Sequence, residues 1–261
     1  GVAVQTNLEA FRLGRRLAVE HELLAELEDV VDTDDAGPAP LTGKLARMAD
    51  QIGGGAELQE ILAYRLPELA EFQNTRYAQQ FTDDIIAVRR AEQRLVGERT
   101  ELSQVASRML YKAMAYKDEY EVARLALKSD IVAQAKARFG PDAKVSYQLK
   151  PPTLKSAGYD KKIAIPEAAG RAMFEGLKRT KRMRGKAFDP FGRTEERRIE
   201  RQLIDEYRDL LTTLTTKLTG DNYGHAVEIA GLYDMVRGFD DIKLANVERY
   251  RTELAQALAG Y

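Results

Sequence analysis

Apolar residues recur at every third or fourth position along most of this 261-residue chain, the spacing that places them on one face of an α-helix. In the longest such stretch, Pro67 favours a kink or a break near Arg65, because proline removes a helical hydrogen bond and its ring clashes with the preceding turn. The fold class expected is mainly α, a multi-helix globular domain. The pattern predicts helices over residues 4–27, 41–52, 56–96, 98–127, 129–139, 167–183, 194–218, 223–236 and 240–258.

The period changes to two around residues 144–166. Val145, Tyr147 and Leu149 alternate with polar residues, and Ile163 and Ile165 do the same. Alternation of this kind is typical of half-buried strands, so we expect a small β-hairpin or strand pair here.

The hydrophobic pattern also divides the chain into three parts. The pattern predicts a terminal helix over residues 1–28 and the main helical domain over residues 56–261. Between them, residues 29–55 predict an acidic linker that is rich in glycine and proline and holds the short helix over 41–52. The residues that interrupt regular structure in this linker are Asp32, Asp34, Asp35, Gly37, Pro38, Pro40 and the Gly53-Gly54-Gly55 run.

Composition narrows the chemistry that this segment can perform. With no cysteine and two histidines, it offers no disulfide, thiol nucleophile or cysteine-bound cluster, and we expect no catalytic residue and no metal site in it. Forty basic and 41 acidic residues leave a formal net charge of -1, which disfavours a general nucleic-acid partner. The sequence has no apolar run long enough to span a bilayer and no secretory signal, and it opens with Gly1. We therefore expect an excised piece of a cytoplasmic protein with no membrane role.

The segment Met114–Leu125 combines tyrosines and charged residues at helical spacing. Lys117 and Glu121 lie four residues apart, as do Tyr120 and Arg124, so a continuous helix would pair them. One interpretation is a structural helix with buried tyrosine rings and paired ions. The other is a surface that contacts a cofactor-bearing domain.

Two further features lie between residues 178 and 194. The segment Phe188-Asp-Pro-Phe-Gly192 has the residue choice of a type I turn, and Thr194 after it is a helix N-cap candidate. Its phenylalanines either hold the loop on the core or dock it onto a neighbouring domain. The cations just before it form either a solvated face or a patch for an anionic partner. These candidate patch residues are Lys178, Arg179, Lys181, Arg182, Arg184 and Lys186.

Several separated motifs, in the same order, resemble the C-terminal region of the fused indolepyruvate ferredoxin oxidoreductases. They are Met114–Leu125, Phe188–Gly192 with the Glu-Arg-Arg that follows it, Arg197–Arg201, and Arg237-Gly-Phe239 with Lys243 and Asn246 after it. The opening Gly1–Arg15 looks like the last helix of that family's gamma-type domain, and the rest resembles its C-terminal extension of unknown function. The chain departs from the family after Phe239, where Asp240 and Asp241 stand in place of a common glycine and histidine.

The resemblance implies a parent enzyme that oxidises an aromatic 2-oxoacid with thiamine diphosphate, iron–sulfur clusters, ferredoxin and coenzyme A. In that family the cofactors belong to upstream domains, so this segment is expected to bind none and to act as a non-catalytic structural and interdomain module. The alternative is a recognition module that docks ferredoxin or coenzyme A phosphates through the basic residues 178–186. Whether the parent enzyme forms a homo-oligomer stays open. The candidate interdomain contacts are Tyr116, Lys117, Glu119, Tyr120, Arg124, Phe188, Asp189, Phe191, Arg237 and Phe239.

Overall fold

A computed structural model describes residues 8, 11–12, 15–16, 37–129, 131–149, 163–186 and 188–261. The chain divides into two compact units, Gly1–Ala39 and Pro40–Tyr261. In the first unit residues 8, 11–12 and 15–16 are helical, residues 37–39 belong to no helix or strand, and the rest of the helix predicted over 4–27 lies outside the described residues.

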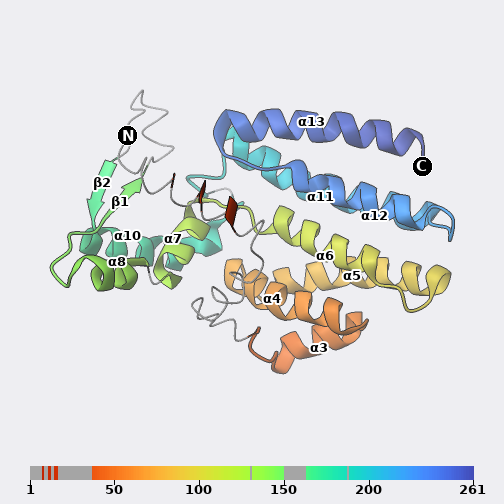
Figure 1. Ribbon diagram of the computed structural model, residues 1–261, viewed down its shortest axis with the longest axis horizontal. Coiled ribbons are helices and arrows are strands. Elements are labelled where there is room, and N and C mark those ends of the chain that lie inside the picture. Colours follow the sequence, from red (N-terminus) through yellow and green to blue (C-terminus); the bar gives the residue numbers. More distant parts are fainter. Residues whose placement is uncertain are drawn as a thin grey trace. The chain divides into compact units, whose positions relative to one another are not determined.

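The second unit is mainly α-helical with one pair of antiparallel strands, which confirms the predicted fold class (Figure 1). None of the helices in the described ranges is long and apolar enough to cross a membrane. The elements are α3 (Gly43–Ile52), α4 (Ala56–Phe72), α5 (Thr75–Val96), α6 (Glu101–Met114), α7 (Glu119–Lys128), α8 (Ile131–Phe139), β1 (Ser146–Leu149), β2 (Ile163–Pro166), α10 (Glu167–Thr180), the 3-10 helix η1 (Lys181–Met183), α11 (Glu195–Lys217), α12 (Tyr223–Gly231), the 3-10 helix η2 (Leu232–Met235) and α13 (Asp240–Ala259).

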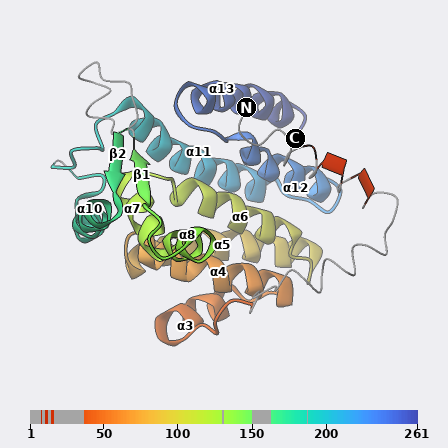
Figure 2. The same ribbon diagram turned by 60° about the vertical axis from the view of Figure 1, so that its left-hand side comes forward.

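Helix α6 lies at the centre of a helical bundle and packs against α4, α5, α11 and α12 (Figure 2). Its small residues Ser103, Ala106 and Ser107 are fully buried, so neighbouring helices can approach it from several sides. The hydroxyl of Ser107 donates to the carbonyl of Ser103, which satisfies a polar group inside the core. We call α3 to α6 together with α11 to α13 the bundle.

Helix α3 belongs to the folded unit, although the sequence placed it in a linker. Met48, Ala49 and Ile52 are buried in the same hydrophobic core as α4 and α5. The folded unit therefore begins at about Pro40, earlier than the predicted boundary at Ala56.

The elements α7, α8, β1, β2 and α10 form a second group, which we call the small lobe. Its main contacts are internal: α7 packs on α10, and the hairpin packs on the start of α10. Strand β1 pairs with β2 in antiparallel register, with Tyr147 opposite Ile165, which confirms the predicted strand pair. The Tyr147 ring meets Phe174 edge to face at 4.9 Å. Gly170 makes this packing possible, because a Cβ there would lie 2.4 Å from the Tyr147 ring.

Two predicted helices are each divided into two. The helix predicted over 56–96 continues through Pro67 and breaks instead after Phe72, so of the kink or break predicted near Arg65 the break is wrong. Asn74 begins α5, because its side chain accepts a hydrogen bond from the N–H of Tyr77. The helix predicted over 98–127 is also wrong as a single element, since α6 ends before residue 115 and α7 begins at Glu119.

Candidate functional site

The segment Met114–Leu125 contains a turn between α6 and α7. Asp118 starts α7, because its carboxylate accepts a hydrogen bond of 2.8 Å from the N–H of Glu121. The turn leaves Lys117 exposed and outside either helix, and Glu121 pairs with Arg124. The expected pairing of Lys117 with Glu121 along one helix is therefore wrong.

Arg184 holds this turn against the end of α4. Its Nε and Nη2 donate to the two carboxylate oxygens of Asp118 at 2.5 and 2.8 Å, a bidentate ion pair buried on both sides. Its Nη1 donates to the carbonyl of Phe72 and, at 3.2 Å, to Oε1 of Gln73. The guanidinium carbon lies 3.6 Å from the centre of the Phe72 ring, a cation–π contact. Arg184 is thus an internal residue, in contrast to its predicted place in an exposed patch.

Tyr120 joins α7 to the turn that precedes α11. Its hydroxyl donates to Oδ1 of Asp189 at 3.0 Å, and its ring meets Phe191 edge to face at 5.4 Å. Asp189 also accepts hydrogen bonds from the backbone N–H groups of Gly185 and Phe191. Burial and the bond to Asp189 raise the pKa of Tyr120, so its hydroxyl stays protonated and acts as the donor. Gly192 is required here, because a Cβ would lie 2.5 Å from Asp189 Oδ2.

Carboxylates near the end of α4 meet cations from α7. Arg124 donates to Glu68 and to Glu71, each at 2.5 Å, and also to Glu121 in its own helix at 2.7 Å. Lys128 pairs with Glu68 at 2.6 Å. Burial alone would raise the pKa of Glu68, and the hydrogen bonds from Lys128 and Arg124 outweigh it, so the pKa is lowered and the carboxylate stays ionised.

A third set of ion pairs connects α7, α11 and α13. Arg197 in the first turn of α11 lies 3.5 Å from Glu119 and also binds Glu200. Glu200 is buried and binds Lys243 in α13 as well. Together with the contacts of Arg184, Tyr120 and the α4 carboxylates, these pairs form one polar region, which we call the junction.

Comparison with known proteins shows a match to one family, and the matched residues include the whole junction. Residues 58–256 match a family of unknown function, DUF6537. The chain belongs to this family. No curated protein and no solved structure gives a significant match. The match begins in α4 and ends in α13, so every ion pair of the junction falls within the DUF6537 domain.

The DUF6537 fold brings some of the predicted interdomain residues together inside the chain and leaves others on its surface. The side chains of Tyr116, Tyr120, Arg124 and Asp189 are buried, and Glu119 and Phe191 are half-buried in the junction. Exposed side chains are found at Lys117, Phe188, Arg237 and Phe239. Phe188 is 85% exposed and Phe239 is 69% exposed, so neither holds its loop, whereas Phe191, the second phenylalanine of the turn, packs against the buried Tyr120.

The predicted basic patch is smaller than the sequence indicated. Lys181 donates to the carbonyl of Glu71, and Arg184 is buried in the junction, so neither presents a free charge. Four cations remain exposed, with no ion pair to any residue that the structure describes. These residues are Lys178, Arg179, Arg182 and Lys186.

Of the acidic residues of the junction, the sequence prediction named Glu119 and Asp189 as candidate contacts. Asp118 and Glu200 lie in the quoted motifs without a predicted role, and Glu68 and Glu71 were not singled out, although each of the four is bound to an arginine or a lysine. One signal was present, since Asp118 followed three residues later by Glu121 is a helix-start pattern. The other three carboxylates have no such local signal.

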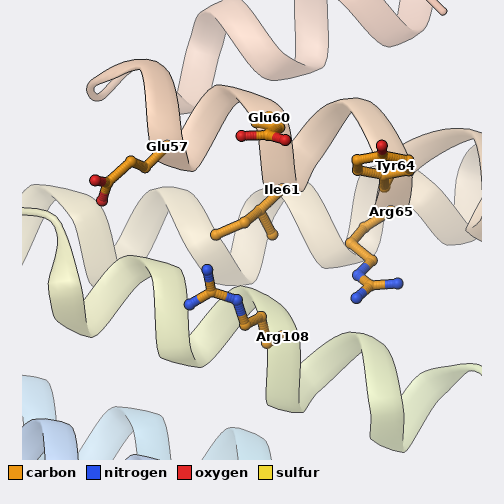
Figure 3. A pocket seen from close by; sticks show the side chains of 6 residues that line it. All are labelled: Glu57, Glu60, Ile61, Tyr64, Arg65 and Arg108. Atoms are coloured by element: carbon orange, nitrogen blue, oxygen red, sulfur yellow. The ribbon is translucent and has the colours of Figure 1, made fainter. Parts of the chain in front are cut away.

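A shallow pocket lies between α4 and α6, outside the junction (Figure 3). It has a volume of about 270 Å³. Arg65 is held by Tyr111, whose ring centre lies 4.4 Å from the guanidinium carbon. The lining includes two glutamates and one arginine from α4 and one arginine from α6, so the charges cancel and favour no single class of ion. Its lining residues are Glu57, Glu60, Ile61, Tyr64, Arg65 and Arg108.

In the described ranges, no three side chains among histidine, cysteine, aspartate and glutamate gather where they could hold a metal ion. The junction itself consists of carboxylates bound to cations and of the Tyr120 hydroxyl, which acts as a donor. Such an arrangement can fix the relative positions of helices. It places no nucleophile beside a general base.

Proposed function

We propose that the chain is a non-catalytic structural and interdomain module of a larger oxidoreductase. That enzyme would oxidise a 2-oxoacid, typically indolepyruvate, with thiamine diphosphate and iron–sulfur clusters bound by other domains of the same polypeptide. Ferredoxin and coenzyme A would be its electron acceptor and acyl acceptor. The proposal combines the resemblance of the motifs with the positions of their side chains.

One observation supports a structural role above all. The motifs that carry the resemblance bind one another: Tyr120 binds Asp189, Arg197 lies against Glu119, and Lys243 binds Glu200. Side chains that bind one another hold the helices in fixed relative positions and are not available to bind a substrate. Chemistry between cofactors depends on position to within about 1 Å, so a rigid module of this kind supports turnover by holding domains in place.

Two exposed phenylalanines are the best candidates for the contact with the neighbouring domains. Phe188 precedes α11 and Phe239 precedes α13. The ion pair between Glu200 and Lys243 places the starts of these two helices side by side, so both phenylalanines lie at the same end of the bundle. Exposed aromatic side chains at one end of a domain are typical of an interaction surface.

The test uses the full-length parent enzyme. Phe188→Ser together with Phe239→Ser is expected to lower coenzyme-A-dependent oxidation of indolepyruvate about tenfold, with thiamine and cluster content unchanged. Phe139→Ser is the matched control, because Phe139 is a similarly exposed phenylalanine on α8 in the small lobe. Equal activity of the double variant and the control would contradict the proposed contact. Turnover of any 2-oxoacid by the isolated chain would contradict the non-catalytic role.

The exposed cations favour a second candidate function, the recognition of an anionic partner. Lys178, Arg179, Arg182 and Lys186 lie at and just after the end of α10 and pair with no described residue. Ferredoxin, which is acidic, or the phosphates of coenzyme A would be attracted to such a patch.

Charge reversal distinguishes this candidate from the structural role. Arg179→Glu with Arg182→Glu should raise the apparent KM for ferredoxin or coenzyme A and flatten its dependence on salt. Arg90→Glu with Arg94→Glu makes the same change of charge on the exposed face of α5 and serves as the control. If both double variants keep the same KM and the same salt dependence as the parent, the basic residues are a solvated face.

A further inference from the structure

The small lobe meets the bundle mainly through charges, and apart from the pair of Glu119 with Arg197 these charges converge on one helix end. Four cations contact the last turns of α4, and all of them follow the start of α7 in the sequence. They are Arg124, Lys128, Lys181 and Arg184. Two of them bind the carboxylates of Glu68 and Glu71, and two bind the free carbonyls of residues 71 and 72. The C-terminus of a helix carries partial negative charge, which adds to the charge of the two glutamates.

Apart from the edge-to-face contact of Tyr120 with Phe191, the apolar packing of the bundle does not continue into the small lobe. The main hydrophobic cluster of buried residues draws on α3 to α6 and α11 to α13, together with Tyr116 in the turn before α7. The buried apolar residues of the small lobe, Tyr120, Ala123 and Phe174, are outside that cluster. Helix α8 has no buried residue at all. The lobe therefore has its own packing, separate from the core of the bundle.

The chain passes between bundle and lobe at two short segments that lie outside the α-helices. One is the turn at 115–118 between α6 and α7. The other follows η1 and includes Gly185, whose φ of 70° lies in the region that favours glycine. Hinges are short segments of this kind that join two separately packed bodies.

We propose that the small lobe moves as a rigid body relative to the bundle, and that the ionic contact with the end of α4 holds it closed. Ion pairs contribute less net stability than apolar packing of the same area, because desolvation of the charges offsets most of their attraction. A lobe held mainly by ion pairs therefore opens at a lower free energy than the bundle unfolds. The hinge does not depend on the identity of the parent enzyme.

The test removes the acidic side of the contact without shortening any side chain. Glu68→Gln with Glu71→Gln leaves the lobe cations in place and takes away their two partners on α4. Asp84→Asn is the control, because Asp84 pairs with Arg208 between α5 and α11, inside the bundle. Spin labels can be placed at single sites without background, since the chain has no cysteine.

Labels at Phe139→Cys in α8 and Leu95→Cys in α5 report the distance between lobe and bundle, and both positions are exposed. A second pair, Leu95→Cys with Gln256→Cys in α13, reports the bundle alone. In the Glu68→Gln, Glu71→Gln background, the lobe pair should gain a second, broader distance population while the bundle pair stays unchanged. Asp84→Asn should leave the lobe pair as it is in the parent chain.

Hydrogen exchange provides an independent measurement. The amides of α7 and α10 should exchange about tenfold faster in the double variant, while those of α6 keep their protection. An unchanged lobe distance in the double variant would overturn the proposal. So would a simultaneous loss of protection in α7 and α6, because the lobe would then open only when the whole unit unfolds.

Discussion

Three tyrosines, Tyr207, Tyr233 and Tyr250, pack edge to face in the bundle, with ring centres 5.2 and 5.4 Å apart. Their hydroxyls differ in what they bind. Tyr207 donates to the carbonyl of Ala230 at 3.0 Å, whereas the buried hydroxyl of Tyr250 has no partner among the residues that the structure describes. Burial raises the pKa of both, so both hydroxyls are neutral.

Replacing each tyrosine by phenylalanine should therefore have different effects. Tyr207→Phe loses a buried hydrogen bond and is expected to lower the free energy of unfolding by about 1 kcal/mol. Tyr250→Phe removes a buried polar atom that has no partner among the described residues and should be neutral or stabilising. Urea denaturation of the two variants measures this difference, and an equal loss in both would contradict the assignment.

Glu101 gives the chain a specific dependence on acid. Its hydrogen bond from Arg99 lowers its pKa from 4.5 to about 2. A carboxylate with a lowered folded-state pKa stabilises the fold above its unfolded pKa and loses that contribution as the pH falls through the folded value. The contribution of Glu101 is thus complete above about pH 4.5 and disappears toward pH 2.

The substitution Glu101→Gln should lower the free energy of unfolding at pH 7, and the difference from the parent chain should shrink as the pH falls from about 4.5 to 2. Urea denaturation at a series of pH values follows this change. Glu60→Gln removes an exposed carboxylate that has no ion pair to a described residue, so it gives the baseline. A difference that stays constant down to pH 2 would show that the bond from Arg99 is not the cause.

At the scale of the elements, the break between α6 and α7 depends on Asp118. Its carboxylate both caps α7 and neutralises the buried Arg184. Asp118→Asn keeps a side chain that can cap the helix but leaves the arginine without its counter-ion. We expect the free energy of unfolding to fall by about 3 to 5 kcal/mol, the usual cost of an uncompensated buried charge.

Arg237→Gln is the control for this substitution. It breaks an exposed pair with Asp234, for which the expected loss is at most about 1 kcal/mol. Both variants can be compared by urea denaturation. Similar losses in the two would mean that burial of the Asp118 pair adds nothing.

The two broken helices show why some elements can be predicted from the sequence and others cannot. Strongly periodic segments that end at clear signals were predicted well: α11 begins after the N-cap Thr194, and α8 ends before Gly140. The breaks at Gln73 and at 115–118 interrupt segments whose apolar periodicity continues across them, so the period alone predicts one long helix. The proline signal in α4 was misleading, because Leu66 and Leu69 on either side of Pro67 are fully buried and tertiary packing keeps the helix intact.

The junction was predictable only in part for a related reason. The sequence marked Tyr120, Asp189 and Arg124 as candidate interdomain contacts, and in the structure all three lie in the junction, bound to residues of the same chain. Their partners lie up to about 70 residues away in the sequence, and no local pattern indicates which ions meet. Exposure also depends on tertiary structure, which is why Arg184 was assigned to the surface.

At the scale of the whole molecule, the position of α3 determines where the folded unit begins. The acidic, glycine-rich and proline-rich residues around it predicted a linker, yet Met48 and Ile52 are each only 4% exposed. Gln59 in α4 donates to the carbonyls of Ala49 and Gly53, which ties the end of α3 to the next helix. A flexible linker would make neither contact.

This difference can be measured with two truncated chains, one starting at Pro40 and one at Ala56. Removing α3 takes away the burial of Met48 and Ile52, which stabilises the fold by about 1.5 to 3 kcal/mol for each side chain. Part of this loss is offset, because the chain no longer has to order the residues of α3. The chain from Ala56 should therefore lose about 3 kcal/mol in the free energy of unfolding relative to the chain from Pro40. Urea denaturation would show this as a lower midpoint. Equal stability of the two chains would mean that α3 covers the core without stabilising it. The minimal folded unit would then begin at Ala56, the boundary predicted from the sequence.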